Sequence, residues 1–138
     1  LCLRLSAAPD SLNQLAASIA SLAERERWDD ALGFQVDLIL EELVQNVIAY
    51  GYPDGREGEI VVSIEREGDL LIFSVDDDGD EFDPLTLPEP DLTSSITERD
   101  IGGLGIHFAR TYTDEQAYCR DAGRNKIRLC KRISDRMT

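Results

Sequence analysis

Histidine, cysteine and long apolar runs are scarce in this 138-residue chain, and each scarcity excludes a class of protein. His107 is the single histidine, and Cys2, Cys119 and Cys130 are scattered without a close pair. This excludes a Cys/His metal cluster. It also argues against a disulfide framework, so we expect packing roles for the cysteines and a reducing, cytoplasmic location. No apolar run approaches the roughly 20 residues that span a membrane.

Positive charge is also in short supply. The 14 Lys and Arg residues stand against 28 Asp and Glu residues, so the net charge is 14 − 28 = −14. Such a chain repels phosphate backbones, which argues against direct nucleic-acid binding and makes a basic protein partner easier to accommodate. The length and the hydrophobic content of 42% predict one globular domain over residues 1–138.

Hydrophobic periodicity predicts the order strand, helix, helix, strand, strand, helix, strand, strand. We therefore expect an α+β fold, a two-layer sandwich with helices on one face of a mixed, mostly antiparallel sheet. The expected elements are 1–6, 11–27, 31–50, 60–64, 71–75, 103–114, 116–120 and 125–132.

A long segment without periodicity follows the fifth element. Residues 84–100 contain three of the five prolines. Loops of this length are uncommon in compact domains and are usually functional lids or disordered segments. We therefore expect this stretch to serve a binding site or to lack fixed structure.

The first motif with chemical meaning is Glu42 and Asn46 in the second expected helix. At about 100° per residue these side chains lie about 40° apart, whereas Glu41 points about 140° away from Asn46. The amide oxygen can ligate a hard cation such as Mg²⁺, and the carboxylate can take a proton. The alternative is two polar residues at the margin of an apolar helix face.

The second motif is the acidic segment that ends the 71–75 strand. Asp77 is in phase with Phe73 and Val75, which predicts a side chain on the core side of the sheet. A buried carboxylate needs a partner, and an adenine amine is one candidate. Gly79 would let the backbone turn and approach a ligand. An acidic turn is the alternative; a calcium loop is disfavoured because the spacing does not fit the EF-hand.

The third motif is the glycine cluster before the third expected helix, containing Gly103, Leu104 and Gly105. Glycines at a helix start expose backbone N–H groups where the helix dipole favours anions. The spacing differs from the dinucleotide-binding fingerprint, and no Gly-Lys-Ser/Thr follows as in a P-loop. The cluster therefore indicates phosphate binding of another kind.

Taken in order, the motifs in 42–52, 77–84 and 102–107 resemble those of the GHKL (Bergerat-fold) ATPases. Within that superfamily the chain resembles the RsbW/SpoIIAB-like anti-sigma factor serine-protein kinases. The resemblance covers nearly the whole chain and implies a two-layer HATPase fold that binds ATP and Mg²⁺, with a lid over about 85–101.

The resemblance also implies a role for each motif residue. Glu42 would be the general base, and Asn46 would hold Mg²⁺ across the ATP phosphates. Asp77 would accept a hydrogen bond from adenine, with Gly79 shaping the pocket. The segment 103–105 would supply phosphate-side backbone.

By the same resemblance, the substrate would be a serine of a STAS-type anti-anti-sigma protein, and the second partner would be an alternative sigma factor that is held inactive. A homodimer through the strand edge Leu1–Ser6 would also fit. Three departures stand out: Tyr50 replaces a common histidine, Glu81 replaces a frequent glycine, and the last strand lacks the threonine that often follows a glycine there, reading Gly123-Arg-Asn-Lys126-Ile127. A binding module without phosphoryl transfer, or a domain from a larger regulator, stays open.

Overall fold

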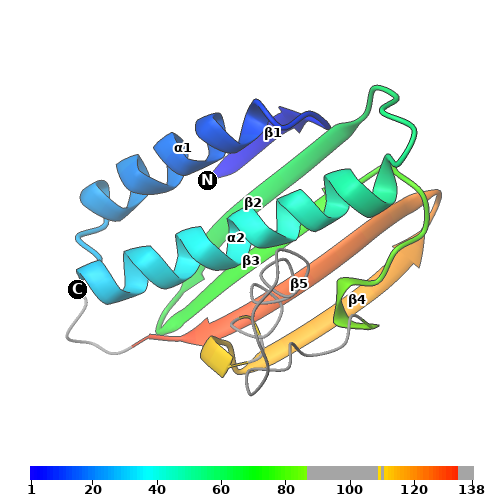
Figure 1. Cartoon of the computed structure of the whole chain (residues 1–138). Coiled ribbons are helices and arrows are strands. Elements are labelled where there is room, and N and C mark those ends of the chain that lie inside the picture. Colours follow the sequence, from blue (N-terminus) through cyan, green and yellow to red (C-terminus); the bar gives the residue numbers. More distant parts are fainter. Residues whose placement is uncertain (87–108, 110, 134–138) are drawn as a thin grey trace, which may run out of the picture.

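A computed structural model describes residues 1–86, 109 and 111–133 of the chain. Its centre is a five-stranded sheet in the order β1-β2-β3-β5-β4 (Figure 1). Every strand pair in these residues is antiparallel, so the expected parallel component of a mixed sheet is not found there. The strands are β1 (Cys2–Ser6), β2 (Glu59–Glu67), β3 (Leu70–Asp77), β4 (Glu115–Asp121) and β5 (Arg124–Arg132).

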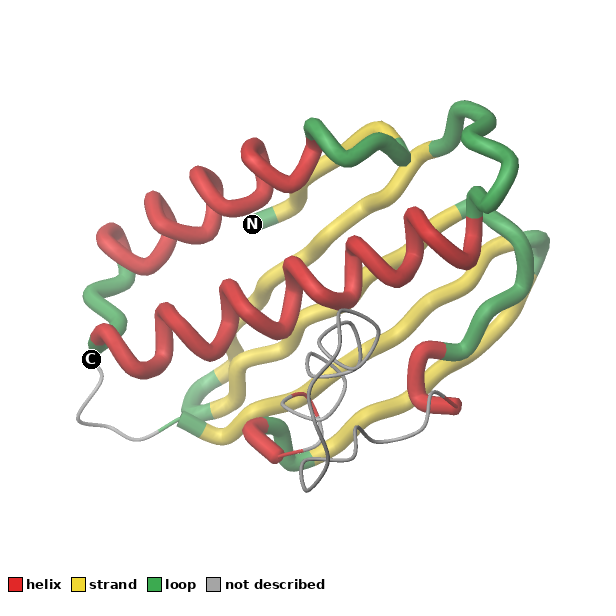
Figure 2. The backbone as a smooth tube through the Cα atoms, viewed as in Figure 1, coloured by secondary structure: helices red, strands yellow, loops and turns green. Residues whose placement is uncertain are grey.

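Two helices, α1 (Ser11–Arg25) and α2 (Asp30–Gly51), lie side by side across one face of this sheet, as Figure 2 shows most clearly. The expected two-layer α+β architecture is therefore confirmed. The core forms where the apolar stripes of the helices meet the inward face of the strands. Its largest fully buried side chains include Leu15, Ile19, Ile39, Leu40, Leu43, Ile60, Phe73, Ile127 and Leu129.

Local chemistry sets the bounds of both helices. The Asp29 carboxylate accepts the Leu32 N–H over 2.8 Å and so caps the start of α2. Helix α1 ends at Arg25, two residues before the expected end, because Arg27 takes a left-handed φ of 57° that a right-handed helix does not allow. Helix α2 extends one residue beyond the expected span at each end.

Both hairpins turn where the sequence predicts. Gly68 has a φ of 61° between β2 and β3. Between β4 and β5, Ala122 and Gly123 both have positive φ, at 52° and 77°, as a tight type I′ turn requires. These turns fix the register that pairs Asp77 of β3 with Asn125 of β5.

The segment between β3 and β4 is described only at its ends. A short 3-10 helix, η1, covers Pro84–Thr86. Ala109 is fully buried and helical, and it accepts the Thr113 N–H over 3.1 Å, which agrees with the end of the helix expected over 103–114. The rest of that helix and of the expected lid lies outside the described residues.

Two of the three cysteines do not have the expected packing role. Cys130 is buried, but Cys2 and Cys119 are exposed, because each is out of phase with the neighbouring strand residues that face the helices. Within the described ranges, no helix has the length and apolar character needed to cross a membrane.

Candidate nucleotide-binding site

Asp77 is the last residue of β3 and is only 2% exposed, as its phase in the strand predicts. Its Oδ1 accepts two hydrogen bonds of 2.9 Å, from the Gly79 N–H and from Asn125 Nδ2. Burial raises the pKa of this carboxyl, and the two hydrogen bonds oppose that rise. Within the described residues no donor is recorded for Oδ2, so this oxygen can accept a hydrogen bond from a ligand.

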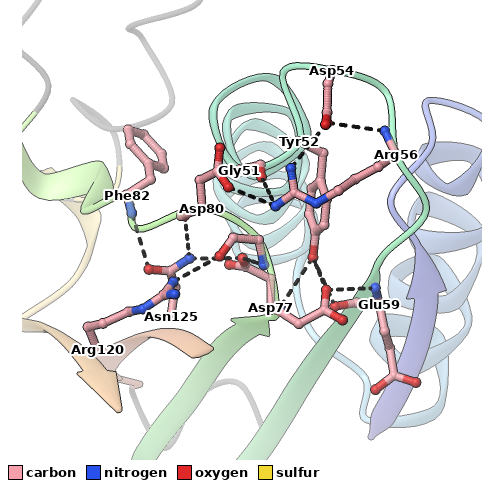
Figure 3. Close-up of polar contacts among 12 residues, drawn as sticks. Gly51, Tyr52, Asp54, Arg56, Glu59, Asp77, Asp80, Phe82, Arg120 and Asn125 are labelled. Atoms are coloured by element: carbon pink, nitrogen blue, oxygen red, sulfur yellow. Dashed lines mark hydrogen bonds and ion pairs between the residues drawn. The ribbon is translucent and has the colours of Figure 1, made fainter. Parts of the chain in front are cut away.

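Asn125 is a site residue that sequence reasoning did not include. Its Nδ2 donates to Asp77 Oδ1 and, over 2.8 Å, to the Asp80 carbonyl. Its Oδ1 accepts the Phe82 N–H over 3.1 Å (Figure 3). The same oxygen also accepts the Tyr118 hydroxyl. These four bonds use the whole hydrogen-bonding capacity of the amide. Its inward phase with Ile127 was the available signal, but its role as a link depends on partners far away in the sequence.

The turn after β3 is attached to the end of α2. The Asp80 N–H donates to the Gly51 carbonyl over 2.8 Å, and Arg56 Nη2 reaches the same carbonyl over 3.2 Å and Asp80 Oδ1 over 2.8 Å. A Cβ on Gly79 would lie 2.7 Å from the Gly51 oxygen. Glycine is therefore needed at this position. The close approach that Gly79 permits is between the acidic turn and the end of α2, rather than the expected approach to a ligand.

Tyr52 holds the other side of the same turn. Its hydroxyl donates to Asp78 Oδ1, and the Asp78 N–H donates back to that hydroxyl over 3.1 Å. Burial raises the pKa of Tyr52, while the hydrogen bond from Tyr52 lowers the pKa of Asp78. The Asp78 and Asp80 side chains of this acidic turn are thus engaged in contacts within the protein. In the part of the chain that the structure describes, no group of three potential ligands could hold a metal through His, Cys, Asp or Glu.

Glu42 and Asn46 lie on α2 and carry buried polar atoms without partners. Asn46 is 7% exposed, and neither its Nδ2 nor Glu42 Oε2 has a hydrogen-bond partner within the described ranges. Such atoms are costly to bury unless another group satisfies them, which a ligand can do. Burial also raises the pKa of Glu42. An amide and a carboxylate of this kind fit a magnesium-bound phosphate.

Glu41 has a different environment from Glu42. Its pKa rises to about 7, first through burial and then through the hydrogen bond and charge of Asp37. It lies one residue away from Glu42 and therefore about 100° around the helix. Glu41 thus forms a carboxyl pair with Asp37, and the charge of Glu42 adds a smaller rise to its pKa. The pKa of Glu42 is raised by burial, with no contribution from Asp37.

A small hollow lies under the last turns of α2; it has about 170 Å³ of space between atoms but is too narrow to admit a water molecule. The hollow is smaller than the usual 300–1,000 Å³ of ligand pockets. The rings of Tyr50 and Phe82 stack 4.7 Å apart at the same end of the domain. Its lining comes from α2, three strands and the segment after β3. The lining residues are Val47, Val75, Asp77, Phe82, Pro84, Tyr118, Asn125 and Ile127.

The structure therefore brings only some of the expected site residues together around this hollow. Asp77 lines the hollow, and so does Val47, which adjoins Asn46 in the sequence, but Glu42 and Asn46 do not line it. Gly79 supports the turn beside it. Gly103, Leu104 and Gly105 lie outside the described residues, as does the expected lid apart from Leu85 and Thr86.

The antiparallel sheet with two covering helices, the buried aspartate at a strand end and the Glu-x-x-x-Asn motif of α2 are the features expected of an ATPase-type nucleotide-binding domain. The chain belongs to the histidine kinase-like ATPase domain family, which matches residues 5–131. Membership of this family implies ATP binding.

Three similar proteins support this family assignment. The serine/threonine-protein kinase BtrW of Bordetella bronchiseptica is 25% identical over 108 residues, which are 78% of this chain and 76% of BtrW. Two solved structures share the fold at lower identity. The RsbU and RsbW domains of Rv1364c from Mycobacterium tuberculosis match with a TM-score of 0.66 and 20% identity, over 96% of this chain and 32% of that one.

The second solved structure is the SiaB–SiaC complex from Pseudomonas aeruginosa. It matches with a TM-score of 0.62 and 17% identity, over 96% of this chain and 89% of the matched chain. At these identities the solved structures establish the fold, and the α+β sandwich expected from the sequence is the one they share.

Proposed function

We propose that this protein is an ATP-dependent protein kinase that phosphorylates a serine of a STAS-type anti-anti-sigma protein in the cytoplasm and sequesters an alternative sigma factor. The family match supports ATP binding, and the name of the relative BtrW supports transfer to serine or threonine. The solved SiaB–SiaC complex supports a protein partner. The observation that carries the proposal is the pair of orphaned buried atoms on Glu42 and Asn46.

In this proposal Glu42 is the general base. The serine oxygen forms a bond to the γ-phosphorus of ATP, the bond from that phosphorus to the β–γ bridging oxygen breaks, and ADP leaves. The serine proton passes to the Glu42 carboxylate. A raised pKa suits this task, because a base works best when its pKa approaches the working pH.

Asn46 would hold Mg²⁺ through its amide oxygen, and its Nδ2 would donate to a phosphate oxygen. The cation would neutralise charge on the phosphates. Asp77 would accept the adenine amine through Oδ2, and Gly79 would keep the adjoining turn close to α2. The segment 103–105 would supply backbone N–H groups to the phosphates under the lid 85–101.

The decisive experiment compares two neighbouring carboxylates. Glu42→Ala should retain ATP binding in calorimetry while phosphorylation of a STAS-domain protein offered as substrate falls by about 10²–10⁴. Phosphate transfer is read by mass spectrometry of that protein. Glu41→Ala is the matched control, because it removes the adjacent carboxylate on the same helix, and it should keep transfer within about threefold of wild type.

Equal transfer by Glu42→Ala and wild type would remove Glu42 from the role of base. Equal losses from both substitutions would assign the effect to the charge of α2. Loss of ATP binding in Asn46→Ala, with the fold intact by circular dichroism, would support the assignment of Asn46.

The small size of the hollow favours a second candidate, a module that binds nucleotide or partner without transferring phosphate. Both candidates bind a partner, but only the kinase leaves a phosphoserine on it. Mass spectrometry of the STAS protein after incubation with wild type, ATP and Mg²⁺ separates them directly.

A further inference from the structure

Residues of α1 and α2 line a second concave surface at the start of α2, the end of that helix opposite Gly51. The two helices lie side by side in Figure 1. The volume of this concave surface is about 420 Å³, within the range of binding pockets, whereas the hollow beside Asp77 is too narrow to admit a water molecule. Small side chains leave this space open: Ala16, Ala20 and Ala23 come from α1 and Gly33 from α2. A Cβ on Gly33 would lie 3.7 Å from Ala23 Cβ, so the helices are close there and the groove lies above their contact.

An aromatic side chain stands exposed on this groove. Phe34 is 67% exposed, the highest value among the large exposed apolar side chains of the described residues. Water-exposed phenylalanine in a concave apolar surface is typical of interaction sites, where buried aromatic residues supply much of the binding energy.

The charge of the groove has one sign. Glu24, Asp29, Asp30 and Asp37 line it, and no Lys or Arg does. Asp29 accepts the N-cap hydrogen bond of α2. Within the described residues, no ion pair involves Glu24, Asp30 or Asp37. A partner that presents Lys or Arg beside an apolar group would meet charge of the opposite sign in this groove.

Buried polar atoms provide an independent sign of a missing partner. Trp28 is 9% exposed and lines the groove, and its Nε1 has no hydrogen-bond partner within the described residues. Asp37 Oδ1, also on the groove, is buried and without a partner as well. A buried indole N–H normally donates a hydrogen bond, so an acceptor from outside the chain would satisfy it.

We propose that this groove binds a basic amphipathic helix of a protein partner. A bulky apolar side chain of that helix would pack over the alanines beside Phe34, and its Lys and Arg residues would pair with Glu24, Asp30 and Asp37. The net charge of −14 disfavours a second copy of this chain and an anionic membrane as occupants. The proposal stands apart from the kinase assignment, because none of these residues belongs to the nucleotide site.

Trp28 allows the test to be direct, because it is the only tryptophan of the chain. The probe is a synthetic helical peptide of about 14 residues, roughly four turns, with a leucine stripe and lysines on its flanks. Titration should change the tryptophan emission saturably at micromolar peptide. An analogue with glutamate in place of lysine, and one with serine in place of leucine, should not produce this change.

Two variants and a matched control locate the binding. Phe34→Ala should weaken peptide binding about tenfold or more. The double variant Glu24→Gln/Asp30→Asn should weaken it about tenfold and reduce its salt dependence. Asp10→Asn/Asp121→Asn removes the same charge from exposed positions off the groove and should bind as wild type; the Asp10 side chain makes no capping hydrogen bond.

Absence of a saturable change with the lysine peptide would overturn the proposal. Equal affinity of wild type, Phe34→Ala and the double variant would overturn it too, because binding would then occur elsewhere. Sedimentation showing a wild-type dimer that Phe34→Ala dissociates would assign the groove to self-association instead. None of these outcomes depends on phosphate transfer, so the failure of this proposal and failure of the kinase assignment are separate results.

Discussion

Asn125 Nδ2 lies 2.9 Å from Asp77 Oδ1, and the two residues are direct partners across β5 and β3. The same amide also holds the Asp80 carbonyl and the Phe82 N–H. One side chain therefore fixes the orientation of the buried carboxylate and the path of the chain that follows it. This arrangement makes Asn125 a positioning residue for Asp77.

Replacement of Asn125 should damage both stability and nucleotide binding. Asn125→Ala leaves the buried Asp77 carboxylate with one hydrogen bond fewer, which should cost about 1–3 kcal/mol in urea denaturation. ATP affinity measured by calorimetry should fall about tenfold, because Asp77 and the adjoining turn lose their shared support. The exposed Asn13→Ala is the control and should stay within about 0.5 kcal/mol. An unchanged urea midpoint for Asn125→Ala would contradict this role.

Two glycine substitutions should have opposite effects on stability. Gly79→Ala places a methyl group 2.7 Å from the Gly51 carbonyl oxygen, so α2 and the acidic turn must move apart. We expect a loss of about 1–3 kcal/mol in thermal or urea unfolding, together with weaker ATP binding. Gly33→Ala, inside α2, meets only an ordinary contact at 3.7 Å and should gain about 0.5–1 kcal/mol. A stable, ATP-binding Gly79→Ala would show that the close approach is dispensable.

Glu41 should make the protein less stable as the pH rises from about 5 to 8. Its pKa is about 7 in the folded state against an ordinary value of 4.5, so the folded protein holds more protons in this interval. Stability from that proton is complete below 4.5 and is lost as the pH rises through 7. Solvent screening of this partly exposed side chain limits the change to roughly 1 kcal/mol.

Substitution of Glu41 tests that effect. Glu41→Gln should match wild type near pH 5 in urea denaturation and exceed it by roughly 1 kcal/mol near pH 8. The exposed strand variant Glu65→Gln is the control and should follow the wild-type curve. Equal stability of Glu41→Gln and wild type at both pH values would rule out the carboxyl pair with Asp37 as the source.

Several elements of the site could be predicted from the sequence because they depend on local periodicity. Alternation in β3 places Asp77 on the buried face, and the helical repeat separates Glu41 from Glu42. The two carboxylates do have different environments in the structure, with Asp37 acting on Glu41 only. The glycine and lid motifs were also identified from the sequence, but their placement stays a prediction.

The sequence by itself determined the order of the described helices and strands, the hairpin turns and the inward phase of Asp77, because turn chemistry and periods of 2 and 3.6 act over a few residues. Only the tertiary structure decided that Asn125 supports Asp77, that Gly79 approaches Gly51, and that α1 and α2 leave an acidic groove at Phe34. Each of these depends on the register between strands or the spacing between helices, which residues distant in the sequence set together.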